Sequence, residues 1–185
     1  MKLKDIVRNS AIYLGLDSVK NYIDNVGTAT AETLKEVDLL TNLANLVIGE
    51  LASAYVPMLY SETETAESGK IYFSALSKDP VKITAVKDGY GNNADFKIFP
   101  EYIAVKDGSY EITYQYIPSN YNLTDDLGYK PQDVPAPAFS YGLCAEYCIT
   151  RCRFEEAVAW RKRYVAALEK VLAPKNRVMK GREFI

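Results

Sequence analysis

The sequence predicts an α+β fold: a helical bundle formed by N- and C-terminal helices, an inserted antiparallel β unit and an extended C-terminal arm. Three observations lead to it. Apolar residues recur at helical spacing near both ends of the chain. From Lys70 their period changes to two, which is typical of strands with one buried face. The basic segment after Pro174 is too short to bury a core of its own.

The N-terminal part, residues 1–60, is expected to supply the first helices of the bundle. Residues 2–14 carry one apolar face, as in a short amphipathic helix. A longer helix over about 30–55 has an apolar stripe so wide that it is expected to be buried on more than one side. Thr30 is its candidate N-cap, and Pro57 is expected to stop it.

The inserted β unit is expected over residues 70–117, with four or five antiparallel strands. The polar, acidic stretch 61–69 before it is predicted to be a loop. Asp-Gly pairs follow alternating runs at 88–89 and 107–108, and this is a strong short-range signal for hairpins. The sequence therefore predicts two hairpins, with one sheet face polar or rich in tyrosine.

The C-terminal part is expected to complete the bundle. Residues 118–137 contain several prolines and read as an ordered linker. Two helices follow within 138–173, a central one over about 136–152 and an amphipathic one over about 154–172. The arm is expected over 174–185. The apolar stripe of the second helix consists of Phe154, Ala157, Val158, Tyr164, Leu168, Val171 and Leu172.

The charge of the chain is unevenly distributed. From Arg151 onward the net charge is +6, against −8 for the preceding residues and −2 overall. Opposite charges at the two ends suit contacts between copies or docking on an acidic partner. No segment has the length of apolar sequence that a membrane span needs, and the N-terminus does not read as a signal peptide. The chain is expected to be made in a cytoplasm.

The sequence offers little for catalysis. It contains no histidine, which excludes His-based nucleophile systems and zinc motifs, and it has no phosphate-binding glycine loop. Cys144, Cys148 and Cys152 are spaced like ligands of a metal cluster, but steps of four on a helix form a line and do not converge. We expect core cysteines, and no catalytic residue, metal or cofactor.

Candidate partner-binding residues gather in the last helix and the arm. Trp160 beside a basic run favours an interface, with a nucleic-acid patch as the weaker interpretation. Apolar anchors between cations suit a segment that orders on an acidic, grooved partner. The candidates are Trp160, Arg163, Lys175, Arg177, Lys180, Arg182, Phe184 and Ile185.

The C-terminal third resembles a known family of assembly proteins. Gly142-Leu-Cys-Ala-Glu-Tyr147, Arg153-Phe-Glu-Glu-Ala157, Trp160-x-x-x-Tyr164-x-x-Ala-Leu168 and the basic tail are similar to the C-terminal half of tailed-phage head-to-tail connector adaptors, including the tail tubular adaptor of short-tailed phages. The resemblance implies a structural virion protein, made in the bacterial host cytoplasm. It implies a ring of about twelve copies joining the portal protein to a neighbouring tail protein, with DNA at most passing through the ring lumen.

A stand-alone helical protein-interaction module of bacterial origin is the alternative. The same stretch is similar to one tetratricopeptide hairpin, but such repeats need about three copies to bury a core, and the sequence shows one. Stoichiometry separates the two interpretations, because the first requires a cyclic oligomer.

Overall fold

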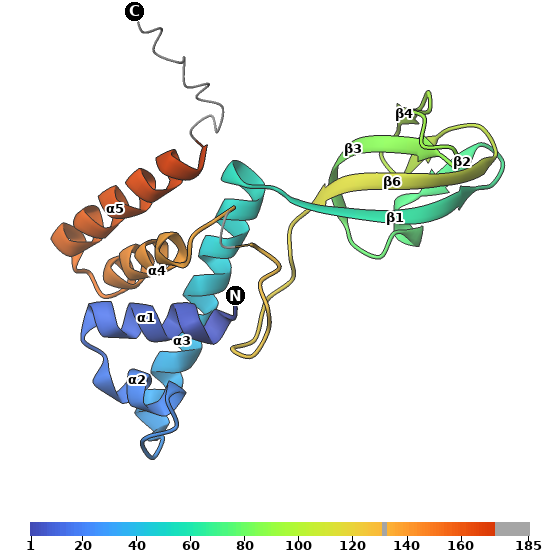
Figure 1. Cartoon of the computed structure of the whole chain (residues 1–185). Helices are drawn as coiled ribbons and strands as arrows, with labels where there is room; N and C mark the ends of the chain where they lie inside the picture. The colour runs from blue at the N-terminus through green and yellow to red at the C-terminus, as the bar shows by residue number, and fades with distance from the viewer. Residues whose placement is uncertain (131–132, 173–185) are drawn as a thin grey trace, which may run out of the picture.

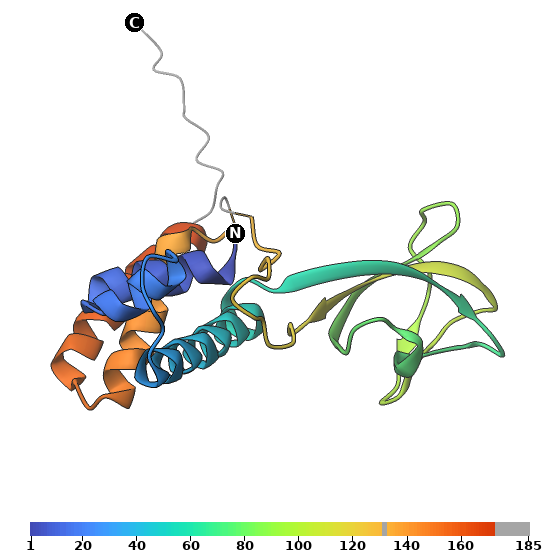
Figure 2. The ribbon, with the colours of Figure 1, turned by 90° about the horizontal axis from the view of Figure 1, so that it is seen from below.

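The computed structural model describes residues 1–130 and 133–172, and it has two lobes (Figure 1). One lobe is a body of helices from both ends of the chain. The other is a β unit that projects from the body, as the second view also shows (Figure 2). The predicted α+β class is confirmed, with the β unit inserted between the two sets of helices.

The two predicted N-terminal helices form, as α1 (Leu3–Leu14) and α3 (Ala31–Glu50), and a π-helical turn, η1 (Leu51–Tyr55), continues α3. A short helix between them, α2 (Asp17–Ile23), was not predicted. Thr30 is confirmed as the N-cap of α3, since its side chain accepts a hydrogen bond from the Thr33 N–H at 3.1 Å. Pro57 follows the last turn, where its missing N–H and fixed φ angle prevent further helix.

The C-terminal helices are α4 (Ala136–Thr150) and α5 (Phe154–Leu172). Most of α4 is buried, because it packs against α1, α3 and α5. Gly142 allows this close packing. A Cβ atom at that position would lie 2.8 Å from Cγ1 of Val47 on α3 and 3.1 Å from the ring of Tyr164 on α5.

The apolar stripe predicted for α5 is only partly covered. Tyr164 and Leu168 are buried, but Phe154 and Val158 are 62% and 56% exposed. The reason is position: α5 lies on the outside of the body and packs mainly on α4 (Figure 1). A stripe read from sequence shows which face is apolar and not how much of it another element covers.

The β unit consists of two three-stranded antiparallel sheets with strand orders β1-β6-β3 and β2-β5-β4. The strands are β1 (Met58–Ala66), β2 (Lys70–Tyr72), β3 (Pro80–Asp88), β4 (Lys97–Ile98), β5 (Tyr102–Ala104) and β6 (Gly108–Tyr116). The loop predicted over 61–69 was wrong for residues 61–66, which belong to β1. Pairing with β6 along nine residues outweighs the local polarity of this segment.

Of the two predicted hairpins, the first forms only as a short antiparallel turn and the second was wrong. After Asp88 the chain folds back so that Lys87 bridges Asn93, but the long partner of β3 is β6 and not β4. The second Asp-Gly pair joins β5 to β6, and these two strands lie in different sheets. The first pair makes a tight turn, in which the Asp88 carboxylate accepts the N–H groups of Tyr90 and Asn92, each at 2.9 Å. The turn at Asp88 was therefore predicted correctly, whereas the pairing of the strands depends on contacts far along the chain.

Each lobe has its own hydrophobic core, and Tyr116 at the end of β6 packs against both. The predicted linker is held to the body. The Tyr121 N–H donates to Oδ1 of Asn45 on α3 at 2.8 Å, and the Asn45 amide donates to the Tyr121 carbonyl at 3.0 Å. Backbone bonds also join the start of α1 to residues 123–125. Within the described ranges, no helix is both long and apolar enough to cross a bilayer.

Candidate interaction surface

Three helices bring an aromatic cluster together on the body. We call the set Tyr13, Tyr141, Trp160 and Arg163 the aromatic cluster. Ring centroids lie 5.6 Å apart between Tyr13 and Trp160, 5.8 Å between Tyr13 and Tyr141, and 5.9 Å between Tyr141 and Trp160. The Arg163 guanidinium lies over the Trp160 ring, 4.7 Å from its centroid. The cluster joins α1, α4 and α5.

Two members of the cluster were predicted from sequence and two were missed. Trp160 and Arg163 are three residues apart on one helix, so they are neighbours on its surface. Tyr13 and Tyr141 come from α1 and α4, and only the packing of these helices places them beside Trp160. The abundance of tyrosine in the sequence indicates that some tyrosines lie in interfaces, but it does not identify Tyr13 and Tyr141 among them.

The aromatic cluster is partly open to solvent. Tyr13 is 42% exposed, and Tyr141 and Trp160 are half-buried. Burial and the neighbouring Tyr141 hydroxyl raise the pKa of Tyr13, so it stays neutral at physiological pH. Half-buried Trp and Tyr with an Arg are the residue types that carry most binding energy in protein interfaces. The arrangement suits contact with another protein.

The basic run around the cluster divides between two roles. Arg161 points toward the body, where its guanidinium lies 2.8 Å from the Glu50 carboxylate and 3.8 Å from that of Glu146. Arg163 covers Trp160 instead. The run is therefore not one continuous cationic patch, which disfavours the nucleic-acid interpretation of this segment.

The other predicted partner-binding residues lie outside the described residues. These are Lys175, Arg177, Lys180, Arg182, Phe184 and Ile185. The predicted arm, 174–185, lies there as well.

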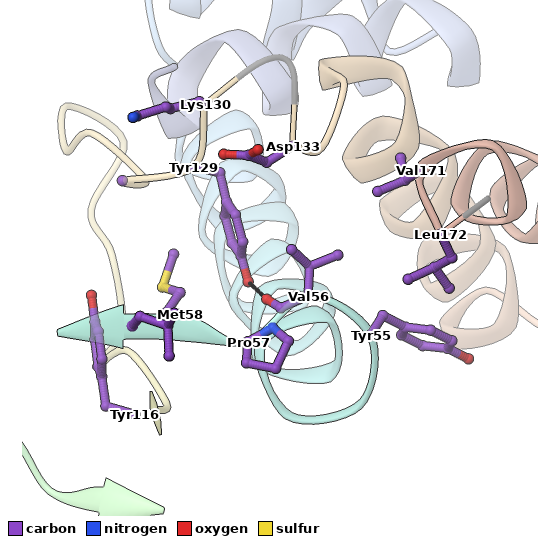
Figure 3. A pocket seen from close by; sticks show the side chains of 12 residues that line it. Tyr55, Val56, Pro57, Met58, Tyr116, Tyr129, Lys130, Asp133, Val171 and Leu172 are labelled. Carbon is purple, nitrogen blue, oxygen red and sulfur yellow. Dashed lines mark hydrogen bonds between the residues drawn. The ribbon is translucent and has the colours of Figure 1, made fainter. Parts of the chain in front are cut away.

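A cleft of about 610 Å³ lies where the two lobes meet (Figure 3). Met58 and Tyr116 line the side of the β unit, and Val171 and Leu172 line the side of α5. The Tyr129 hydroxyl donates to the Val56 carbonyl at 2.9 Å, which ties the linker to the end of η1. Burial and nearby tyrosines raise the pKa of Tyr129, so this donor is retained at neutral pH.

Two of the three cysteines behave as predicted. Cys144 and Cys148 are buried in α4, and burial raises the pKa of Cys144 to about 12. A thiol held neutral in this way is a poor metal ligand and nucleophile. The prediction was wrong for Cys152, which is exposed because α4 ends just before it. Among the described residues, no three His, Cys, Asp or Glu side chains are grouped to hold a metal ion.

Comparison with models of known protein families gives no match, and comparison with curated proteins gives none either.

Proposed function

We propose that this chain is a structural subunit of a phage head-to-tail connector, in which copies form a ring that joins the portal protein to the tail. The proposal is carried by the aromatic cluster, a partly open Trp-Tyr-Arg surface built from three helices. The similarity of residues 142–168 and the basic tail to connector adaptors supplies the kind of assembly.

Two further features support an assembly role. The β unit projects from the helical body, so one copy offers surfaces on two separate lobes to its neighbours (Figure 2). The chain has a basic end and an acidic remainder. This suits head-to-tail contact between copies, because the basic surface of one copy then meets the acidic surface of the next and not its own equivalent. In this proposal the chain performs no catalysis, and DNA at most passes through the lumen of the ring.

The mass of the assembled protein tests this proposal. Native mass spectrometry of the full chain, alone and with the portal protein of the same phage, should show a cyclic oligomer in at least one condition. Twelve copies are expected from the resemblance. A stable monomer in both conditions would favour the stand-alone interaction module and contradict the ring.

A further inference from the structure

The two sheets have four edge strands, and three of them are blocked against pairing with another chain. β2 has three residues and β4 has two, so each is too short to pair extensively. β3 is long, but it begins with Pro80, carries Lys82 and Lys87, and has two irregularities in its register. Short length, proline, lysine and bulges are the usual means of protecting an edge.

β1 is the exception. It has nine residues, pairs with β6 in unbroken register, and contains no proline and no lysine. Within the described chain, no backbone hydrogen bond joins the other side of residues 58–65 to another segment. Figure 1 shows β1 on the side of β6 away from β3. This edge presents unpaired N–H and C=O groups in the pattern that an added strand requires.

The negative charge along the edge of β1 favours a positively charged partner. Residues 58–69 contain Glu62, Glu64 and Glu67 and no cation. Two copies of β1 placed edge to edge would bring like charges together, which destabilises the pairing. A cationic strand is favoured instead. The chain itself contains a cationic segment, residues 173–185, which holds four Lys or Arg residues, one acid and the apolar residues of the predicted arm.

We propose that the C-terminal segment, residues 173–185, of a neighbouring copy adds as a strand to the free edge of β1. This rests on the proposed function in one respect, that copies lie side by side. The segment of the same copy is less suited. Leu172 and Leu59 line one cleft, so a strand that continued directly from Leu172 along β1 would pair with it in parallel. Every strand pair in both sheets is antiparallel, and parallel pairing is slightly less stable.

A labelled synthetic peptide of residues 173–185 tests the inference. Titrated with the full chain and followed by fluorescence anisotropy, it should bind, and added salt should weaken the binding. Glu64→Lys and Glu67→Lys should each weaken it by about two- to five-fold, as the loss of one cross-strand charge pair predicts. Glu101→Lys, an exposed charge reversal between β4 and β5, is the matched control and should bind normally. Circular dichroism checks that each variant is folded.

Hydrogen exchange of the full chain locates the contact. Excess peptide should slow exchange within residues 58–66, whereas a scrambled peptide of equal composition should not. Absence of peptide binding, protection confined to other residues, or equal binding by all three variants would overturn the inference. Protection of β1 that grows with protein concentration and ignores the peptide would indicate pairing of β1 strands, and would overturn it too.

The outcomes separate this inference from the proposed function. Peptide binding on β1 without a cyclic oligomer would contradict the ring and leave strand addition between copies standing. A cyclic oligomer in which β1 stays unprotected would leave the ring and contradict strand addition. The mass of the assembly and the hydrogen exchange of β1 are measured independently, so a negative result can be assigned either to the ring or to strand addition.

Discussion

At the scale of single residues, Trp160 and Arg163 carry the proposed interface. The Arg163 side chain covers the ring of Trp160, and Lys170 lies exposed further along the same helix. If the aromatic cluster contacts a neighbouring copy, Arg163→Ala should weaken assembly by about 1–3 kcal/mol, because hot-spot arginines lose packing as well as charge. Lys170→Ala removes an equal charge outside the cluster and should have little effect.

Sedimentation velocity over a range of protein concentrations measures this difference. Trp160→Ala should weaken assembly at least as much as Arg163→Ala, provided that thermal unfolding shows the monomer intact. Equal assembly by wild type, Arg163→Ala and Trp160→Ala would remove the aromatic cluster from the interface.

Glu62 makes the β unit sensitive to acid. Its carboxylate accepts hydrogen bonds from the Ser77 N–H at 2.9 Å and from the Tyr114 hydroxyl at 2.5 Å. Desolvation acts to raise the pKa of Glu62, but the hydrogen bonds from Ser77 and Tyr114 outweigh it and hold the pKa below its ordinary value. The ionised form is therefore favoured in the folded state.

A lowered pKa gives stability that is complete above the unfolded-state pKa, about 4.3 for glutamate, and is lost as the pH falls through the folded-state value. Wild type should therefore lose stability more steeply than Glu62→Gln as the pH falls below about 5. Urea unfolding at a series of pH values measures the slopes. Parallel curves for the two proteins would show that Glu62 contributes nothing to the acid response.

At the scale of elements, the helices were predictable because their signals are local. The cap at Thr30, the stop before Pro57 and the apolar faces are all contained in neighbouring residues. The strands were less predictable. β1 is an edge strand in which residues 61–65 are all Ser, Glu or Thr, so this part of its sequence resembles a loop, and only the pairing with β6 identifies it as a strand. The turn at Asp88-Gly89 forms as predicted, but which strands pair on either side of each Asp-Gly depends on the assembly of both sheets.

The same division holds for the candidate site. Helical spacing relates Trp160 to Arg163, whereas Tyr13 and Tyr141 join them only through tertiary packing. The free edge of β1 could not be predicted, because the sequence segment was not recognised as a strand. Local chemistry is therefore visible in the sequence, and partners that lie far along the chain are not.

The packing of α4 gives a test at this scale. Gly142→Ala places a methyl group 2.8 Å from Cγ1 of Val47, so the helices must shift, and the free energy of unfolding should fall by about 1–3 kcal/mol. Gly49, inside α3, is the matched control, since a Cβ there meets nothing within 4 Å. Gly49→Ala should stabilise by about 0.5–1 kcal/mol through helix propensity. Chemical denaturation compares both with wild type, and equal stability of the two variants would refute the tight helix seam.

At the scale of the whole molecule, each of the two lobes offers a different contact surface in the proposed assembly. The body holds the aromatic cluster, and the β unit extends a free strand edge away from it (Figures 1 and 2). The two lobes are joined through β1 and β6, and Tyr116 at the end of β6 packs against the hydrophobic cores of both lobes. Neighbouring copies can thus engage both lobes at once, and two linked contacts bind more tightly than either alone.

The proposed connector role is tested by electron cryomicroscopy of the particles that form from the genome encoding this chain. The expected result is a ring of these helical bodies between the portal and the tail, with the aromatic cluster at a contact between protomers. Particles that lack this chain, or that carry it outside the head-to-tail connector, would rule out the proposed role.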